Sequence, residues 1–186
     1  MIFLVVDDDR AVCEGIARRL AQMEHPDIAQ IQTAFSGEAA LRCLAQGPVD
    51  VLITDIEMFE IDGLDLIARA KALQKRLSCI IVTAHEQFAY ARQAIELGVE
   101  DFLLKPIGKA RMRQTVEKVI ERRNTQRRYL EAQLRLILER QLRDDEPWSP
   151  ALFAQAGLPP APKAVCAVAW AKDGPPPEGL GLWTFA

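Results

Sequence analysis

Short apolar runs alternate with stretches of helical period along the first two thirds of the chain. The runs are rich in Val and Ile and span residues 2–6, 28–34, 51–54, 79–83 and 101–104. Between them, apolar residues recur at spacings of three and four, the spacing of one face of a helix. Strands that alternate with helices predict a parallel sheet, because parallel neighbours must be joined by a crossover. We therefore expect a five-stranded, doubly wound α/β fold with strand order 2-1-3-4-5.

Several residues are typical of the first or last position of a helix. Ser36 precedes Gly37 and Glu38 and is a candidate N-cap, and Asp9 is placed to begin the first helix favourably. Gly98 stands where a helix would stop.

A stretch without Gly or Pro follows, from 109 to 143, and predicts one long helix. We place the end of the first domain, 1–122, within it, and treat 123–143 as a linker helix. Arg123 and Arg127 interrupt its apolar seam, so a solvated linker and a dimerising coiled coil both stay open. A DNA-reading role for the arginines is disfavoured, since charge runs usually form solvated faces.

Residues 144–186 form a Pro-rich segment of different composition. A short helix at 152–156 and a strand at 164–171 are expected between the prolines. The segment resembles the start of a second domain that is incomplete here, with a tail that docks on the first domain as the alternative.

Composition excludes several function classes. The net charge is −3, which gives no global attraction to nucleic acid. The four cysteines are far apart and include no Cys-x-x-Cys pair, as expected for core residues in a reducing compartment. No run approaches 18 apolar residues, and the N-terminus carries no secretion pattern. We expect a cytoplasmic protein without a membrane partner.

Polar residues stand where four of the predicted strands end. The first strand ends in an acidic triplet, Asp7, Asp8 and Asp9, and the third ends at Asp55. The fourth strand ends with the hydroxyl of Thr83, and the fifth with the ammonium of Lys105. In an open parallel sheet these ends surround one crevice. Converging carboxylates repel one another unless a hard cation such as Mg²⁺ shares them. The set suits a phosphorylated carboxylate, with a nucleophile, a metal and donors for the phosphoryl oxygens.

On these residues the chain resembles the receiver domain of two-component response regulators. The resemblance covers residues 1 to about 122 and rests on six positions that agree in order and type. The resemblance implies that Asp55 is the phosphoacceptor and that Lys105 pairs with the phosphate. It implies that Thr83 and Phe102 are the switch residues. It further implies that Mg²⁺ is held by Asp7, Asp8, Asp55 and the backbone carbonyl of Glu57. It also implies a cis Lys105–Pro106 bond, and it places His85 and the Glu57 side chain where the family tunes dephosphorylation. One departure is Phe59, which replaces the usual Pro and is expected to free its loop.

The resemblance also implies partners. A sensor histidine kinase would supply the phosphoryl group, and dimerisation would use the receiver face or the long helix. Residues 87–98 resemble the branch joined to AraC-type helix-turn-helix domains, so DNA binding and transcriptional control would belong to an output domain outside this chain. The protein would accept a phosphoryl group without being an enzyme, apart from its own dephosphorylation.

Two alternatives remain at this stage. The Asp7-x-Asp9 pair resembles the nucleophile and acid of haloacid-dehalogenase-like phosphatases, although Ala11 stands where that family has Thr or Val and Asp55 is left without a role. A pseudo-receiver, a dimerisation module that is never phosphorylated, is the other alternative.

Overall fold

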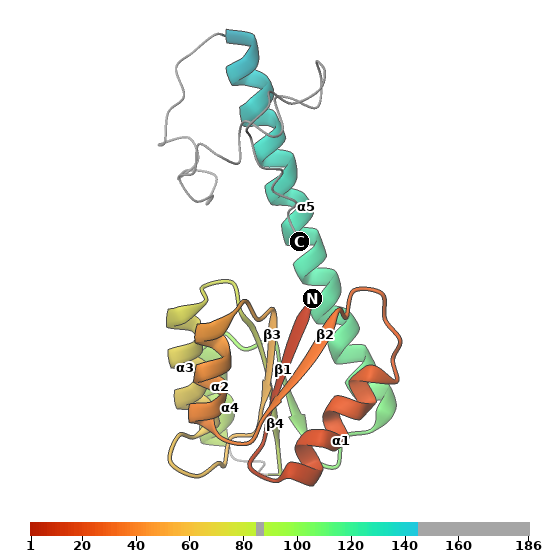
Figure 1. The fold of residues 1–186 in the computed structure, drawn as a ribbon, viewed down its shortest axis with the longest axis vertical. Coiled ribbons are helices and arrows are strands. Elements are labelled where there is room, and N and C mark those ends of the chain that lie inside the picture. Colours follow the sequence, from red (N-terminus) through yellow and green to blue (C-terminus); the bar gives the residue numbers. More distant parts are fainter. Residues whose placement is uncertain (85–87, 145–186) are drawn as a thin grey trace. The chain divides into compact units, whose positions relative to one another are not determined.

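A computed structural model describes residues 1–84 and 88–144 of the chain. It contains a parallel sheet of five strands in the order β2-β1-β3-β4-β5 (Figure 1). The strands are β1 (Ile2–Val6), β2 (Gln30–Ala34), β3 (Val51–Thr54), β4 (Ser78–Thr83) and β5 (Asp101–Leu104). The predicted fold class and strand order are confirmed. The predicted second strand begins too early, because the Ile28 amide donates to the His25 carbonyl in a turn before β2.

Helices connect the strands as the crossover argument requires. They are α1 (Arg10–Ala21), α2 (Gly37–Gln46), α3 (Gly63–Leu73), α4 (Phe88–Glu96) and α5 (Lys109–Asp144). The predicted N-cap is confirmed, since Ser36 accepts from the amide of Ala39. Asp9, expected to begin the first helix favourably, is the N-cap of α1 and accepts from the amides of Ala11 and Val12. Gly98, just beyond α4, has a φ of 63°, the left-handed conformation that glycine adopts without strain.

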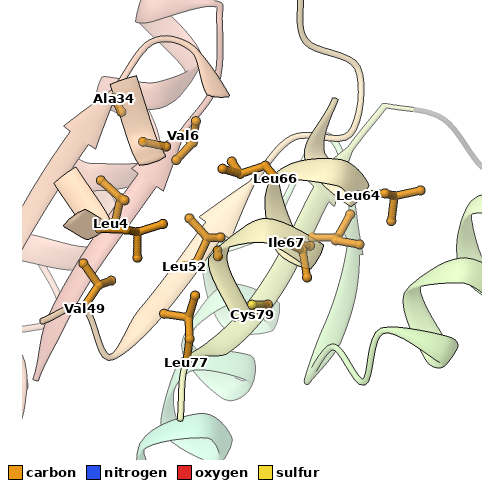
Figure 2. Close-up of a cluster of buried hydrophobic side chains, with 14 of the residues drawn as sticks. Leu4, Val6, Ala34, Val49, Leu52, Leu64, Leu66, Ile67, Leu77 and Cys79 are labelled. Atoms are coloured by element: carbon orange, nitrogen blue, oxygen red, sulfur yellow. The ribbon is translucent and has the colours of Figure 1, made fainter. Parts of the chain in front are cut away.

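Each face of the sheet carries its own apolar core. One core joins the sheet to α2, α3 and α4, and Figure 2 shows Leu4, Leu52 and Ile67 at its centre. The other joins the sheet to α1 and to the first turns of α5. Because helices cover both faces, β1, β3 and β4 are almost entirely buried. α4 is the least embedded helix, since Ala94 is its one buried residue.

Strand register brings the predicted polar residues to one edge. Val6 pairs with Thr54, so the residues that follow them, Asp7 and Asp55, leave the sheet side by side. Thr83 pairs with Leu104, which directly precedes Lys105. The carboxyl ends of β1, β3, β4 and β5 therefore form a common rim.

The chain divides into two compact units, Met1–Glu121 and Arg122–Ala186. The long helix predicted at 109–143 is present as α5. The assignment of 123–143 as a linker helix stays a prediction, and the elements expected at 152–156 and 164–171 lie outside the described residues. Within the described ranges, no helix combines the length and apolar character needed to span a bilayer.

Candidate functional site

Lys105 lies between two carboxylates at the rim. Its Nζ is 2.5 Å from Asp55 Oδ2 and 2.7 Å from Asp7 Oδ2. The two aspartates come from β1 and β3 and the lysine from the end of β5, so strand order alone brings together residues that are distant in sequence. The Lys105–Pro106 bond is cis, as the resemblance implied.

Asp7 and Asp55 are both buried, so their charges and that of Lys105 interact more strongly than they would in water. Asp7 is 1% exposed and Asp55 is 8% exposed. Burial raises the pKa of Asp7, and the hydrogen bond and charge of Lys105 only partly oppose this effect. For Lys105, burial acts to lower the pKa, but hydrogen bonds to Asp55 and Asp7 outweigh it and the pKa is raised. The lysine is therefore protonated and pairs with the two carboxylates at neutral pH.

Backbone amides hold the remaining carboxylate oxygens. Asp7 Oδ1 accepts from the Asp9 amide at 3.0 Å, and Asp55 Oδ1 accepts from the Ile56 amide at 2.6 Å. Both bonds come from residues directly following the strands, so the local turns fix the orientation of the two side chains.

Asp8 and Glu57 lie beside this cluster. Together with Tyr90 and Phe59 they line an open cavity of about 390 Å³. Asp8 is exposed, whereas Asp9 is engaged in capping α1, as expected. Asp8 directly follows Asp7 and Glu57 lies two residues after Asp55, so the cavity is lined by two further acidic residues that follow the ends of the same two strands.

The two predicted switch residues differ in their surroundings. Thr83 is fully buried at the end of β4. Phe102 is half-buried on β5 and packs against the core beneath α4. His85, expected near the site, lies outside the described residues.

The donor set fits a cation that completes its shell with water. Lys105 contacts two carboxylates, those of Asp55 and Asp7, so at this point of the rim the carboxylates outnumber the ammonium. Within residues 1–84 and 88–144, no three His, Cys, Asp or Glu side chains are grouped closely enough to hold a metal by themselves. Mg²⁺ does not require such a cage, because it usually binds one or two carboxylates and keeps several waters.

Gly63 is a site residue that sequence reasoning missed. A Cβ at this position would lie 1.9 Å from the backbone oxygen of Asp55. The absence of a side chain lets the start of α3 approach the phosphoacceptor candidate, and the Gly63 amide donates to the Ile56 carbonyl at 2.8 Å. The Asp62–Gly63 pair, a common turn signal, was the available hint.

Phe59, the departure from the family pattern, is 78% exposed on the loop between β3 and α3. Its neighbour Glu60 has a φ of 64°, a left-handed conformation uncommon outside glycine. The loop mobility expected from the loss of proline stays a prediction.

Comparison with known sequences identifies a family. The pattern of the response regulator receiver domain matches residues 3–117. The transcriptional regulatory protein GlrR of Escherichia coli is 35% identical over 118 residues, which are 63% of this chain and 26% of that protein. The transcriptional regulatory protein YesN of Bacillus subtilis is 29% identical over 117 residues, 63% of this chain and 32% of that protein. The chain thus spans only about a quarter to a third of these two relatives.

Solved structures show the same likeness. The receiver domain of AraT, a response regulator from Geobacillus stearothermophilus, is 33% identical, with a TM-score of 0.60 over 68% of this chain and 97% of that one. A response regulator receiver domain from Clostridium thermocellum is 25% identical, with a TM-score of 0.61 over 67% of this chain and 97% of that one.

Proposed function

Since this chain belongs to the response regulator receiver family, we propose that Asp55 accepts a phosphoryl group from the phosphohistidine of a sensor histidine kinase. The observation that carries this proposal is the contact of one ammonium, Lys105, with both Asp55 and Asp7 at the carboxyl ends of three strands. A carboxylate that is 8% exposed, oriented by an amide and paired with a cation is a well-positioned nucleophile.

In the transfer, an Asp55 carboxylate oxygen forms a bond to phosphorus as the bond between phosphorus and the imidazole nitrogen breaks, and the imidazole leaves with that electron pair. Lys105 remains beside the phosphoryl oxygens and offsets their charge. Asp7, Asp8 and the Glu57 carbonyl would hold Mg²⁺. When bound, the cation would supply charge neutralisation that the single ammonium cannot.

The acyl phosphate brings more negative charge and more acceptor oxygens than the carboxylate it replaces. Thr83 ends β4 on the same rim and would donate its hydroxyl to one of these oxygens. A hydrogen bond to a charged group is worth about 1.5–3 kcal/mol, enough to shift a two-state equilibrium by roughly 10- to 150-fold. Phe102 packs under α4 and would change rotamer as Thr83 moves, altering the surface of α4 and β5.

The output of this switch is transcriptional control through a domain outside the chain. Named relatives such as GlrR and YesN are transcriptional regulatory proteins, and an AraC-type helix-turn-helix output is the specific form we favour. Dimerisation would use the receiver face or the long helix. The protein itself accepts a phosphoryl group and turns over no separate substrate.

A phosphorylation assay tests the proposal. The full chain is incubated with Mg²⁺ and acetyl phosphate, and its intact mass is measured. We expect the wild type to gain the mass of one phosphoryl group and Asp55→Asn to stay unmodified. Asp65→Asn, which alters a surface ion pair of α3, serves as a control and should be modified like the wild type.

The alternatives give other results. A haloacid-dehalogenase-like phosphatase would still form its covalent intermediate on Asp7 in the Asp55→Asn variant. A pseudo-receiver would leave the wild type unmodified, and that result would overturn the proposal.

A further inference from the structure

Phe59 is 78% exposed and lines the cavity that begins directly after the phosphoacceptor. A single exposed apolar side chain needs no explanation by itself, because such residues are common on protein surfaces. Phe59 differs from a scattered surface residue by its location. Ile56 and Asp8, which directly follow Asp55 and Asp7, line the same cavity. A phosphodonor that reaches Asp55 through this opening passes beside the Phe59 ring.

A second aromatic ring, that of Tyr90, lines the cavity from α4. Tyr90 is half-buried and packs against the core, and its hydroxyl donates to Glu57 Oε1 at 3.4 Å. This ring is therefore a wall anchored to the fold. The cavity volume of about 390 Å³ lies within the usual range of small-molecule sites, about 300–1,000 Å³. An aromatic ligand suits such walls, because flat rings pack face to face or edge to face.

The charged residues that line the cavity are all acidic: Asp8, Glu57 and Asp62. Carboxylates disfavour an anionic leaving group, such as acetate, and favour a cation. Aromatic faces add to this preference, since a ring attracts a cation placed over its face. Glu57 and Asp62 would keep their charge when Asp8 holds Mg²⁺. The lining therefore suits a flat ring with a positive charge.

The phosphohistidine of a kinase carries such a ring. Imidazole takes up a proton near neutral pH, here on the nitrogen that does not carry phosphorus. When an Asp55 oxygen bonds to phosphorus, the bond between phosphorus and the other nitrogen breaks and its electron pair stays with the ring. The ring then leaves as neutral imidazole, with its proton still in place.

We propose that Phe59 is a specificity-determining residue that holds the imidazolium ring of the phosphodonor in this cavity, with Tyr90 as a second wall. The inference rests on the proposed function and deepens it, because it assigns a residue to the donor's leaving group. Phe59 contacts the ring before and during transfer alike, so it lowers KM for imidazole donors and leaves kcat nearly unchanged. Acetyl phosphate has no ring, so its reaction does not depend on Phe59.

The test compares two small donors, N-phosphorylimidazole and acetyl phosphate, on the full chain at saturating Mg²⁺. Phe59→Leu keeps an apolar side chain and removes the ring, at a position too exposed to affect the core. We expect kcat/KM for N-phosphorylimidazole to fall roughly two- to fivefold through KM, the scale of an exposed cation–π contact. The value for acetyl phosphate should stay unchanged. Phe59→Trp retains an aromatic face and should keep the wild-type preference.

Leu73→Ala is the control, because it shortens an exposed apolar side chain of α3 that does not line the cavity. It should match the wild type with both donors. A Phe59→Leu variant that slows both donors equally, or neither, would overturn the inference, and so would loss of the preference in Phe59→Trp. A wild type that takes up phosphoryl from neither donor would instead overturn the proposed function, and with it the premise of this inference.

Discussion

At the scale of single residues, the site depends on an imbalance of charge. Lys105 compensates Asp55 and Asp7, yet burial still raises the pKa of Asp7. The ionised form of Asp7 is thus unfavourable for folding until a further cation arrives. A binding site that buries such a charge gains affinity for its cation at the expense of the stability of the metal-free protein.

This imbalance predicts that Asp7→Asn stabilises the metal-free chain. The folded-state pKa of Asp7 lies above the ordinary value of 3.8, so the folded chain binds more protons than the unfolded chain just above pH 3.8. The contribution of Asp7 to stability therefore falls as the pH rises through that window and stays unfavourable at pH 7. We expect the variant to be about 1 kcal/mol more stable at pH 7 in urea unfolding with a chelator.

The stabilisation by Asp7→Asn should shrink as the pH falls below 3.8, because Asp7 becomes protonated in both the folded and the unfolded chain. Asp8→Asn, at the exposed neighbour, should change stability by less than about 0.5 kcal/mol. An Asp7→Asn variant that is less stable than the wild type at pH 7 would contradict the charge argument.

At the scale of elements, the start of α3 and both ends of α4 decide the shape of the site. Gly63 lets α3 begin against the Asp55 backbone. Side-chain hydrogen bonds lie at the two ends of α4, from Tyr90 to Glu57 and from Lys71 to the carbonyls of Leu97 and Gly98. The close approach at Gly63 is a rigid contact, whereas α4 can move when one of the hydrogen bonds at its ends breaks.

Gly63→Ala should destabilise the fold. The added Cβ would lie 1.9 Å from the Asp55 oxygen, so α3 or the end of β3 must shift. Overpacking of this kind is worth about 1–3 kcal/mol, measured as the free energy of unfolding. Gly15→Ala in α1 is the matched control, because no atom lies within 4 Å of its Cβ and it should stabilise by about 0.5–1 kcal/mol. Equal effects of the two substitutions would refute the close-approach argument.

Lys71→Met should loosen α4 without unfolding the sheet. The change removes two hydrogen bonds to the carbonyls of Leu97 and Gly98, which directly follow the C-terminal end of the helix. We expect faster amide exchange in α4, by roughly five- to tenfold, since one such bond is worth about 1 kcal/mol. Lys75→Met, at an exposed neighbouring position, should leave exchange unchanged. Protection of α4 that survives Lys71→Met would show that apolar packing holds the helix instead.

At the scale of the whole molecule, two compact units share one long helix. Beyond residue 121 this helix carries Tyr129 and Leu136, which are 63% and 61% exposed. They are seven residues apart, so both lie on the same helix face. Two exposed apolar side chains on one helix face would suit a second copy of the chain, and we predict that the long helix makes a dimer contact.

Leu136→Lys should therefore weaken self-association of the full chain, with a dimer Kd at least about tenfold higher in sedimentation experiments. Glu131→Lys places a lysine on the opposite face of the helix, with a change of two charge units instead of one, and should leave the Kd within a factor of about two. If Leu136→Lys leaves the Kd unchanged, the long helix is not the contact, and the receiver face remains.

The sequence by itself determined the fold class and predicted which charged residues lie at the rim of the sheet. Hydrophobic periodicity is a local property, so the strands, the helices and the caps at Asp9 and Ser36 could be predicted from neighbouring residues. The predicted parallel sheet placed Asp7, Asp55 and Lys105 at a common rim, because such a sheet gathers the carboxyl ends of its strands.

Only the tertiary structure decided which side chains touch. Lys105 contacts Asp7 across 98 residues and Asp55 across 50, and Tyr90 contacts Glu57 across 33. No local pattern contains such a contact, because it depends on where packing sets each helix against the sheet. The close approach at Gly63 was missed for the same reason. The need for glycine there follows from the position of the Asp55 backbone, which is known only once the chain is folded.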